Sequence, residues 1–232
     1  MKASPLFLLF LLIALPPWSA LGQTTLAQIA VPAANFSFFV TSVGSGDGGN
    51  LGGLKGADAH CQKLAAAVGA GSRTWRAYLS TQALHGGPVV NARERIGQGP
   101  WYNIKGEMIA QSLSHLHGDT IEEARAGNRI NFRTALNELG KEINGHDDAP
   151  DLPRPGDHNW HDIMTGTQWN GMAYTDTADH TCKNWTSNTD GSVQFGHYNR
   201  VNWNSIHGSK ECSQEGLLKE TTGALFYCFA TE

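Results

Sequence analysis

The feature that most constrains the fold of this chain is a set of four cysteines that follow an apolar N-terminal segment. They are Cys61, Cys182, Cys212 and Cys228. Lys2 precedes the apolar run Leu6–Leu15, and small residues then suit cleavage before Gln23. The run is shorter than the roughly 20 residues that a membrane span requires, so no membrane span is predicted. We therefore predict that residues 1–22 are a signal peptide and that the protein is secreted or periplasmic.

Cysteines in an oxidising compartment usually form disulfides, and four of them most simply form two bridges. Three pairings are possible, and the spacing alone does not select one. Residues 23–35 are rich in small residues and lack periodicity, so a flexible lead-in is predicted there. The roughly 200 residues left after cleavage suit one domain with a sizeable core, which we place at 36–230.

Composition narrows the classes of partner. The chain has 27 glycines and 7 tryptophans but only 16% charged residues, which favours tight turns and long loops over long helices. The formal net charge of -4 argues against a protein that coats nucleic acid, because such a partner rewards a basic surface. No nucleic-acid partner is predicted.

Regular elements are predicted near both ends of the domain. Aromatic and β-branched residues indicate a strand at 36–43, and the alternation at 74–80 indicates a second strand. Between them, the glycine-rich segment 44–53 is interpreted as a turn. Apolar residues at helical spacing predict a helix over 56–68, with Cys61 facing the core.

The rest of the domain carries weaker signals. Short helices are predicted at 121–126 and 134–143, and a helical turn at 213–218. A Pro/Asp-rich loop is predicted at 145–156. The apolar run 224–230 predicts a final strand that carries Cys228.

Short segments along the whole domain form a recognisable set. They are Phe38-Phe39-Val40-Thr41-Ser42, Asn50-Leu51-Gly52-Gly53-Leu54, Gly56-Ala57-Asp58-Ala59-His60-Cys61, the strand at Trp75–Ser80, Trp203-Asn204-Ser205, Cys212-Ser213-Gln214 and Gly223-Ala224-Leu225-Phe226-Tyr227-Cys228-Phe229. Together they resemble secreted bacterial lectin-like domains, related to the C-type lectin and endostatin group of folds. The resemblance implies an α+β, C-type lectin-like (endostatin-like) domain: a twisted antiparallel sheet with one or two helices and long loops. It also implies nested disulfides, Cys61 with Cys228 and Cys182 with Cys212.

The calcium–sugar motif of C-type lectins is incomplete in this chain. Those lectins use a Glu-Pro-Asn or Gln-Pro-Asp type tripeptide and a Trp-Asn-Asp tripeptide. Here Trp203-Asn204-Ser205 stands near the second position with Ser205 in place of the carboxylate, and no first tripeptide occurs between Gly145 and Cys182. Because calcium needs several carboxylate oxygens, recognition without that motif is predicted.

The long loops supply the candidate ligand-binding residues. These are Trp169, Trp185, Asn184 and Asn204. Flat aromatic faces and fixed amides suit sugar rings. We predict that Trp169 and Trp185 lie near the surface, whereas Trp75 and Trp203 belong to the core. The alternative for Asn204 is that it braces a loop.

A second constellation contains metal-ligand residue types. Its weak candidates are Asp157, His158, His161 and Asp162. Histidines and carboxylates are ligands that zinc takes, but a solvated polar loop explains the same residues. No cofactor is assigned, although calcium and zinc remain open. His180, His197 and His207 are isolated in sequence and are interpreted as structural or surface histidines.

Signatures of catalysis are missing from the sequence. There is no Gly-x-Ser-x-Gly, His-Glu-x-x-His or phosphate-binding loop, and disulfide-bonded sulfur is no nucleophile. The chain is therefore predicted to be no enzyme, but a recognition module that binds a glycan or an extracellular or cell-surface protein. The alternative is a zinc-dependent hydrolytic enzyme that uses the His/Asp loop 157–162.

Overall fold

A computed structural model describes residues 30–143, 160–220 and 222–232. The predicted signal peptide, most of the lead-in, the 145–156 loop, Asp157 and His158 lie outside these ranges. Among the described residues, no helix is long and apolar enough to cross a membrane. The described part of the chain mixes short strands with short helices in an α+β arrangement.

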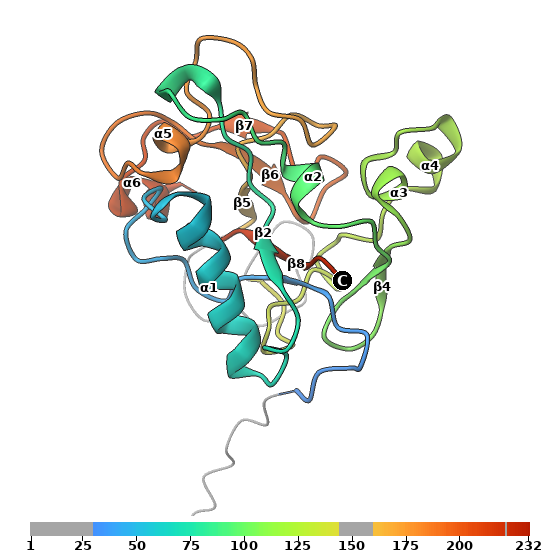
Figure 1. Ribbon diagram of the computed structural model, residues 1–232. Helices are drawn as coiled ribbons and strands as arrows, with labels where there is room; N and C mark the ends of the chain where they lie inside the picture. The colour runs from blue at the N-terminus through green and yellow to red at the C-terminus, as the bar shows by residue number, and fades with distance from the viewer. Residues whose placement is uncertain (1–29, 144–159, 221) are drawn as a thin grey trace, which may run out of the picture.

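The described elements, in chain order, are β1 (Phe38–Val40), α1 (Gly53–Ala67), β2 (Trp75–Ala77), the 3-10 turn η1 (Ala83–His85), α2 (Ala92–Arg95), β3 (Trp101–Tyr102), β4 (Met108–Ala110), α3 (Leu113–His117), α4 (Ile121–Ala126), β5 (Asp162–Met164), α5 (Cys182–Trp185), β6 (Gln194–His197), β7 (His207–Gly208), α6 (Gln214–Lys219) and β8 (Tyr227–Ala230). Figure 1 shows them from the side that α1 covers.

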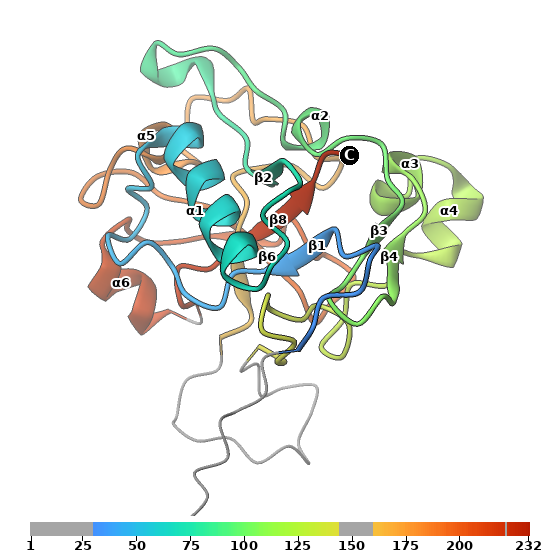
Figure 2. The ribbon, with the colours of Figure 1, turned by 60° about the horizontal axis from the view of Figure 1, so that its bottom comes forward.

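A three-stranded antiparallel sheet lies at the centre, with β8 between β1 and β2 (Figure 2). All four residues of β8 are buried. Because side chains alternate along a strand, Cys228 joins the core cluster on the α1 side, and Tyr227 and Phe229 join the cluster on the other side. This burial on both faces explains the continuous apolar run at the end of the sequence.

Helix α1 packs on one face of this sheet (Figure 1). Its buried residues follow helical spacing and include Cys61, which forms a disulfide with Cys228. Asp58 of the same helix forms ion pairs with Arg76 and Arg95, and its Oδ1 accepts a hydrogen bond from the backbone of Ala77. Asp58 thereby links α1 to β2 and to α2.

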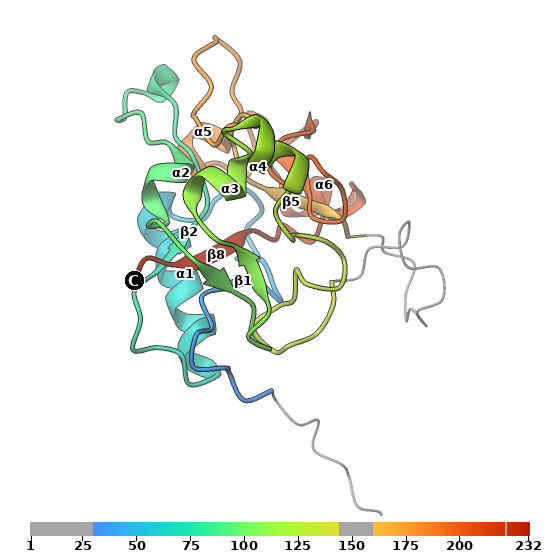
Figure 3. The same ribbon diagram turned by 90° about the vertical axis from the view of Figure 1, so that its right-hand side faces the viewer.

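Helices α3 and α4 lie on the other side of the molecule, beside the β3–β4 hairpin (Figure 3). Ser112 and Thr120 cap the two helices, each accepting a hydrogen bond from the backbone N–H three residues on. Apolar side chains of this region, such as Trp101, Ile109 and Leu116, pack with Phe229 in the second core cluster. The capped helices form one wall of the pocket described below.

A second three-stranded sheet has the order β5-β6-β7, and both of its pairings are antiparallel. It is joined to the central sheet by a bridge between Met164 and Phe226 and by the hydrogen bond from Met164 N to Leu225 O. The core therefore runs from one sheet to the other.

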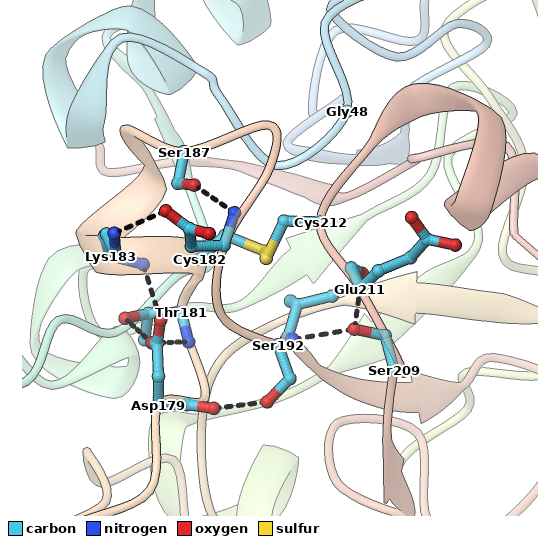
Figure 4. The surroundings of a disulfide bond; sticks show 12 residues. Gly48, Asp179, Thr181, Cys182, Lys183, Ser187, Ser192, Ser209, Glu211 and Cys212 are labelled. Carbon is cyan, nitrogen blue, oxygen red and sulfur yellow. Dashed lines mark hydrogen bonds and ion pairs between the residues drawn. A yellow bond between two sulfur atoms is a disulfide. The ribbon is translucent and has the colours of Figure 1, made fainter.

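The second disulfide, Cys182–Cys212, ties an unusual turn to this half of the molecule (Figure 4). All four residues of α5 have positive φ, between 46° and 68°, so α5 is a left-handed turn and no ordinary helix. Left-handed backbone costs about 1 to 2 kcal/mol for each residue with a side chain. Asp179 helps to hold the turn by accepting from the backbone N–H groups of Thr181 and Lys183.

The glycine-rich segment 44–53 packs against the same disulfide. A Cβ on Gly48 would lie 2.3 Å from Cys212 O, and one on Gly49 would lie 2.5 Å from Cys182 Sγ. Neither position has room for a side chain. The segment is thus a turn, as predicted, and close approach to the disulfide is the reason for Gly48 and Gly49.

Most predicted elements are present. The strands expected at 36–43, 74–80 and 224–230 contain the shorter strands β1, β2 and β8. The helix expected at 56–68 is α1, which begins earlier, at Gly53, and ends at Ala67, and the helix expected at 121–126 is α4. The predicted helical turn at 213–218 matches α6. Both disulfides have the pairing that the resemblance implies.

The helix predicted at 134–143 is wrong. The segment forms turns organised by Asn137, whose Oδ1 accepts hydrogen bonds from the backbone of Leu139 and Lys141. An asparagine side chain that bonds nearby backbone in this way competes with helical bonding.

Candidate binding pocket

A concave pocket of about 750 Å³ opens between α3–α4 and the loop that follows β6. Its size is typical of small-ligand sites. Residues of α3, α4, the loop after β6 and Trp169 line the pocket. The residues are His115–Gly118, Glu123, Ala124, Gly127, Asn128, Ile130, Asn131, Trp169 and Asn199–Asn204.

Trp169 lies on a tight turn, and the residue is 64% exposed. The turn is closed by hydrogen bonds from Gly171 N to Gln168 O and from Gln168 N to Met172 O. Arg93 Nη1 donates to Asn170 O at the outer side of the turn. The indole is therefore exposed on a backbone that is fixed at several points.

Asn204 fixes the same turn from beneath. It is 2% exposed, and its Nδ2 donates to Trp169 O at 3.0 Å and to the Tyr78 hydroxyl at 3.0 Å. Asn204 thus braces the turn, as the alternative interpretation has it, and it also belongs to the pocket lining. The sequence could not decide this because both roles use an amide.

Tyr78 continues this network to His117. The Tyr78 Oη lies 2.7 Å from His117 Nε2, and His117 Nδ1 lies 2.9 Å from Leu113 O. Since a carbonyl only accepts, Nδ1 carries the proton and Nε2 accepts from the tyrosine. The chain of bonds runs from α3 through Tyr78 and Asn204 to the backbone of Trp169.

Burial keeps both ring groups of this network neutral. It lowers the pKa of His117 to about 4, and it raises the pKa of Tyr78. The two shifts oppose proton transfer from tyrosine to histidine near neutral pH. The pair therefore acts as a neutral brace beneath the pocket.

The packing at this brace leaves no space for a larger residue at position 171. A Cβ on Gly171, where φ is +79°, would lie 2.5 Å from His117 Nε2 and 2.9 Å from the Tyr78 hydroxyl. The glycine allows the Trp169 turn to lie directly on the brace.

Asn199 differs from the other asparagines of the pocket. Asn128 and Asn131 bond to nearby backbone with both amide groups, as a brace would. Within the described part of the chain, Asn199 Nδ2 and Oδ1 are both inaccessible to water and have no hydrogen-bond partner. A buried amide without partners is costly, so Asn199 is the lining residue with unmet donor and acceptor capacity.

The structure contradicts the predicted exposure of Trp185. Trp185 is fully buried, and its Nε1 donates to Ser80 O at 2.7 Å. The left-handed turn at α5 places this indole inside the core. Trp75 and Trp203 are buried as predicted, at 1% and 3% exposure.

Asn184, which neighbours Trp185, is also a bracing residue. Its Oδ1 accepts from Gln82 N at 2.8 Å and its Nδ2 donates to Gln82 O at 2.9 Å. Both amide groups are occupied by one backbone residue. Of the four ligand-binding candidates, only Trp169 is exposed at the pocket.

The described residues of the predicted His/Asp constellation do not form a solvated loop. His161 and Asp162 are both buried at the start of β5, and Asp157 and His158 lie outside the described residues. His197 and His207, interpreted as isolated in sequence, both approach Asp162. Strand pairing brings these side chains together, and the spacing of the residues along the chain does not indicate this.

Comparison with known proteins adds no assignment: no protein-family model matches the chain, and no curated protein matches it.

Proposed function

We propose that this chain is a secreted or periplasmic recognition module of the C-type lectin-like class that binds a glycan in the pocket beside Trp169. The observation that carries the proposal is an exposed indole on a braced turn, with the amide of Asn199 at the same pocket. Two disulfides support an oxidising compartment.

Glycans suit Trp169 and Asn199 because a sugar ring has both an apolar face and hydroxyl groups. The apolar face of a sugar ring can pack on the exposed Trp169 indole. Asn199 is partly exposed, so rotation of its side chain would bring the now inaccessible amide to the pocket, where glycan hydroxyls could both donate to it and accept from it. A fixed turn reduces the conformational entropy lost on binding. The pocket thus offers one stacking surface and one unsatisfied polar group.

Calcium is not needed for this mode of recognition. Asn204, in the segment that resembles the second calcium tripeptide, already bonds to Tyr78 and to Trp169 O. Ser205 supplies no carboxylate. Binding is therefore expected to survive a chelator.

A glycan array followed by titration calorimetry tests the proposal. Trp169→Ala should weaken binding of the best glycan by about tenfold or more, since an aromatic anchor in a pocket carries much of the affinity. The matched control is Leu84→Ala, which truncates another exposed apolar side chain, 43% exposed and absent from the pocket lining. It should bind as the parent protein does.

Two results would overturn the proposal. One is glycan binding that Trp169→Ala leaves unchanged. The other is an array without any glycan hit, combined with saturable binding of a protein ligand at another face.

A further inference from the structure

Strand register gathers a cluster of ligand-type side chains on one face of the β5-β6-β7 sheet. Asp162 lies opposite His197, and Phe195 lies opposite His207. Residues two apart on a strand share a face, as do directly opposite residues. Asp162, His197 and His207 therefore share one face, and His161 adjoins them at the start of β5.

The distances show that the side chains converge on one carboxylate oxygen. The Nε2 atoms of His197, His207 and His161 lie 2.7, 3.4 and 3.6 Å from Asp162 Oδ1. His197 Nε2 and His207 Nε2 are 3.1 Å apart. Zinc bonds of about 2.0 to 2.2 Å in tetrahedral geometry place neighbouring ligand atoms about 3.3 to 3.6 Å apart. The separations of His207 and His161 from Asp162 lie in that range, and the separations of 2.7 and 3.1 Å are shorter. His161, Asp162 and His197 offer ligand atoms that all lie within 4.8 Å of one another.

Burial also favours a cation at this point. The side chain of Asp162 is 1% exposed, those of His161 and His197 are 11% and 16% exposed, and that of His207 is 45% exposed. An ionised carboxylate in such a place is stabilised by a nearby positive charge. The exposed His207 leaves a path from solvent to the cluster.

We propose that His161, Asp162, His197 and His207 bind a divalent transition-metal ion of the zinc class. Imidazole nitrogens with one carboxylate select such an ion over calcium, which prefers oxygen ligands. The ion has a structural role: it joins β5 to both ends of the loop between β6 and β7. Asn199–Asn204 of this loop line the glycan pocket.

Metal binding is tested first on the whole protein, purified without a histidine tag and treated with a chelator. Titration with Zn²⁺ should give one equivalent with a Kd below about 1 μM and raise the melting temperature by several degrees. Co²⁺ should give the visible absorption bands of a tetrahedral site. Absence of a saturable zinc signal in the folded protein, or a Co²⁺ spectrum typical of octahedral coordination by water, would overturn the proposal.

Variants then locate the ion. His197→Gln and His207→Gln should each weaken Zn²⁺ binding at least tenfold while the protein stays folded by circular dichroism. His180→Gln is the matched control, because His180 faces Asp176 at 3.0 Å outside the cluster. It should bind Zn²⁺ as the parent does, and equal losses in all three variants would contradict the assignment. If His197→Gln does not fold, the less buried His207→Gln and the Co²⁺ spectrum still decide.

The metal proposal and the glycan proposal fail separately. Glycan titration of the chelated protein measures the pocket with the ion removed, and Zn²⁺ titration of Trp169→Ala measures the metal site with the indole removed.

Discussion

The turns that carry Trp169 and Trp185 are alike in sequence character but differ in the fate of their tryptophans. Both lie in glycine- and asparagine-containing segments between short strands. The Trp169 turn is a tight turn closed by backbone hydrogen bonds between Gln168 and residues Gly171 and Met172, and its indole is exposed. The Trp185 turn is left-handed and held by a disulfide, and its indole is buried.

The difference shows that composition does not decide which loop side chain meets solvent. At Trp169, the brace from Asn204 and Arg93 holds only the backbone. At Trp185, the brace holds the backbone and the side chain, because the indole N–H itself bonds to Ser80 O. The first arrangement suits recognition and the second suits stability.

The largest expected losses of stability follow removal of the two disulfides. Replacing Cys61 and Cys228 together by alanine should cost about 5 kcal/mol, because this bridge closes a loop of 167 residues. Replacing Cys182 and Cys212, which lie 30 residues apart, should cost about 3 to 4 kcal/mol. Denaturant unfolding measures both, and equal or reversed losses would count against the chain-entropy account.

The tryptophans themselves should separate clearly in stability. Trp185→Ala removes a fully buried ring and should cost about 3 to 5 kcal/mol. Trp169→Ala removes an exposed ring and should cost less than about 0.5 kcal/mol. The free energy of unfolding of both variants is measured under the same conditions. A larger loss for Trp169→Ala than for Trp185→Ala would contradict the account.

Acid should weaken the brace beneath Trp169. The pKa of His117 is about 4 in the folded protein and 6.5 for an unperturbed histidine, so the folded state binds fewer protons between these values. Its contribution to stability is therefore present above pH 6.5 and is lost as the pH falls through 4. The loss should reach about 3 kcal/mol.

The control for this pH dependence is His117→Gln, which does not titrate. The free energy of unfolding of each protein is measured by denaturant at pH 7 and at pH 4. The decrease between the two pH values should be smaller in His117→Gln than in the parent, and the difference is the contribution of His117. Identical changes in both proteins would show that His117 has no such role.

The smallest expected effect is on affinity alone. Asn199→Ala should lower glycan affinity by about two- to tenfold through loss of hydrogen bonds, and should not lower stability because the amide has no partner among the described residues. Asn128→Ala is the matched control at the same pocket. It should lose stability instead, since Asn128 bonds to Leu116 O and Ile130 N. The opposite pattern would assign ligand contact to Asn128.

Local patterns in the sequence predict the central sheet and its helix α1 well. Helical spacing places Cys61 in the core, and the apolar run at the C-terminus gives β8. The turn at Trp185 could not be predicted, because four consecutive non-glycine residues with positive φ depend on contacts with Asp179 and Gln82 that lie outside the turn.

The candidate site was predicted only in part, for a similar reason. Trp169 stood out as a loop aromatic, but the amide roles of Asn184 and Asn204 depend on which backbone groups face them. The cluster around Asp162 depends on strand register between residues that are distant in sequence, so His197 and His207 carried no local signal.

The indole N–H signals in the nitrogen–proton NMR spectrum of the protein test the central claim most directly. During titration with the best glycan, the Trp169 signal should shift and should exchange rapidly with solvent in the free protein, because its side chain is exposed at the pocket. The Trp185 signal should stay in place and exchange slowly, because it is buried and bonded to Ser80 O. A shift at Trp185 with none at Trp169 would contradict the account.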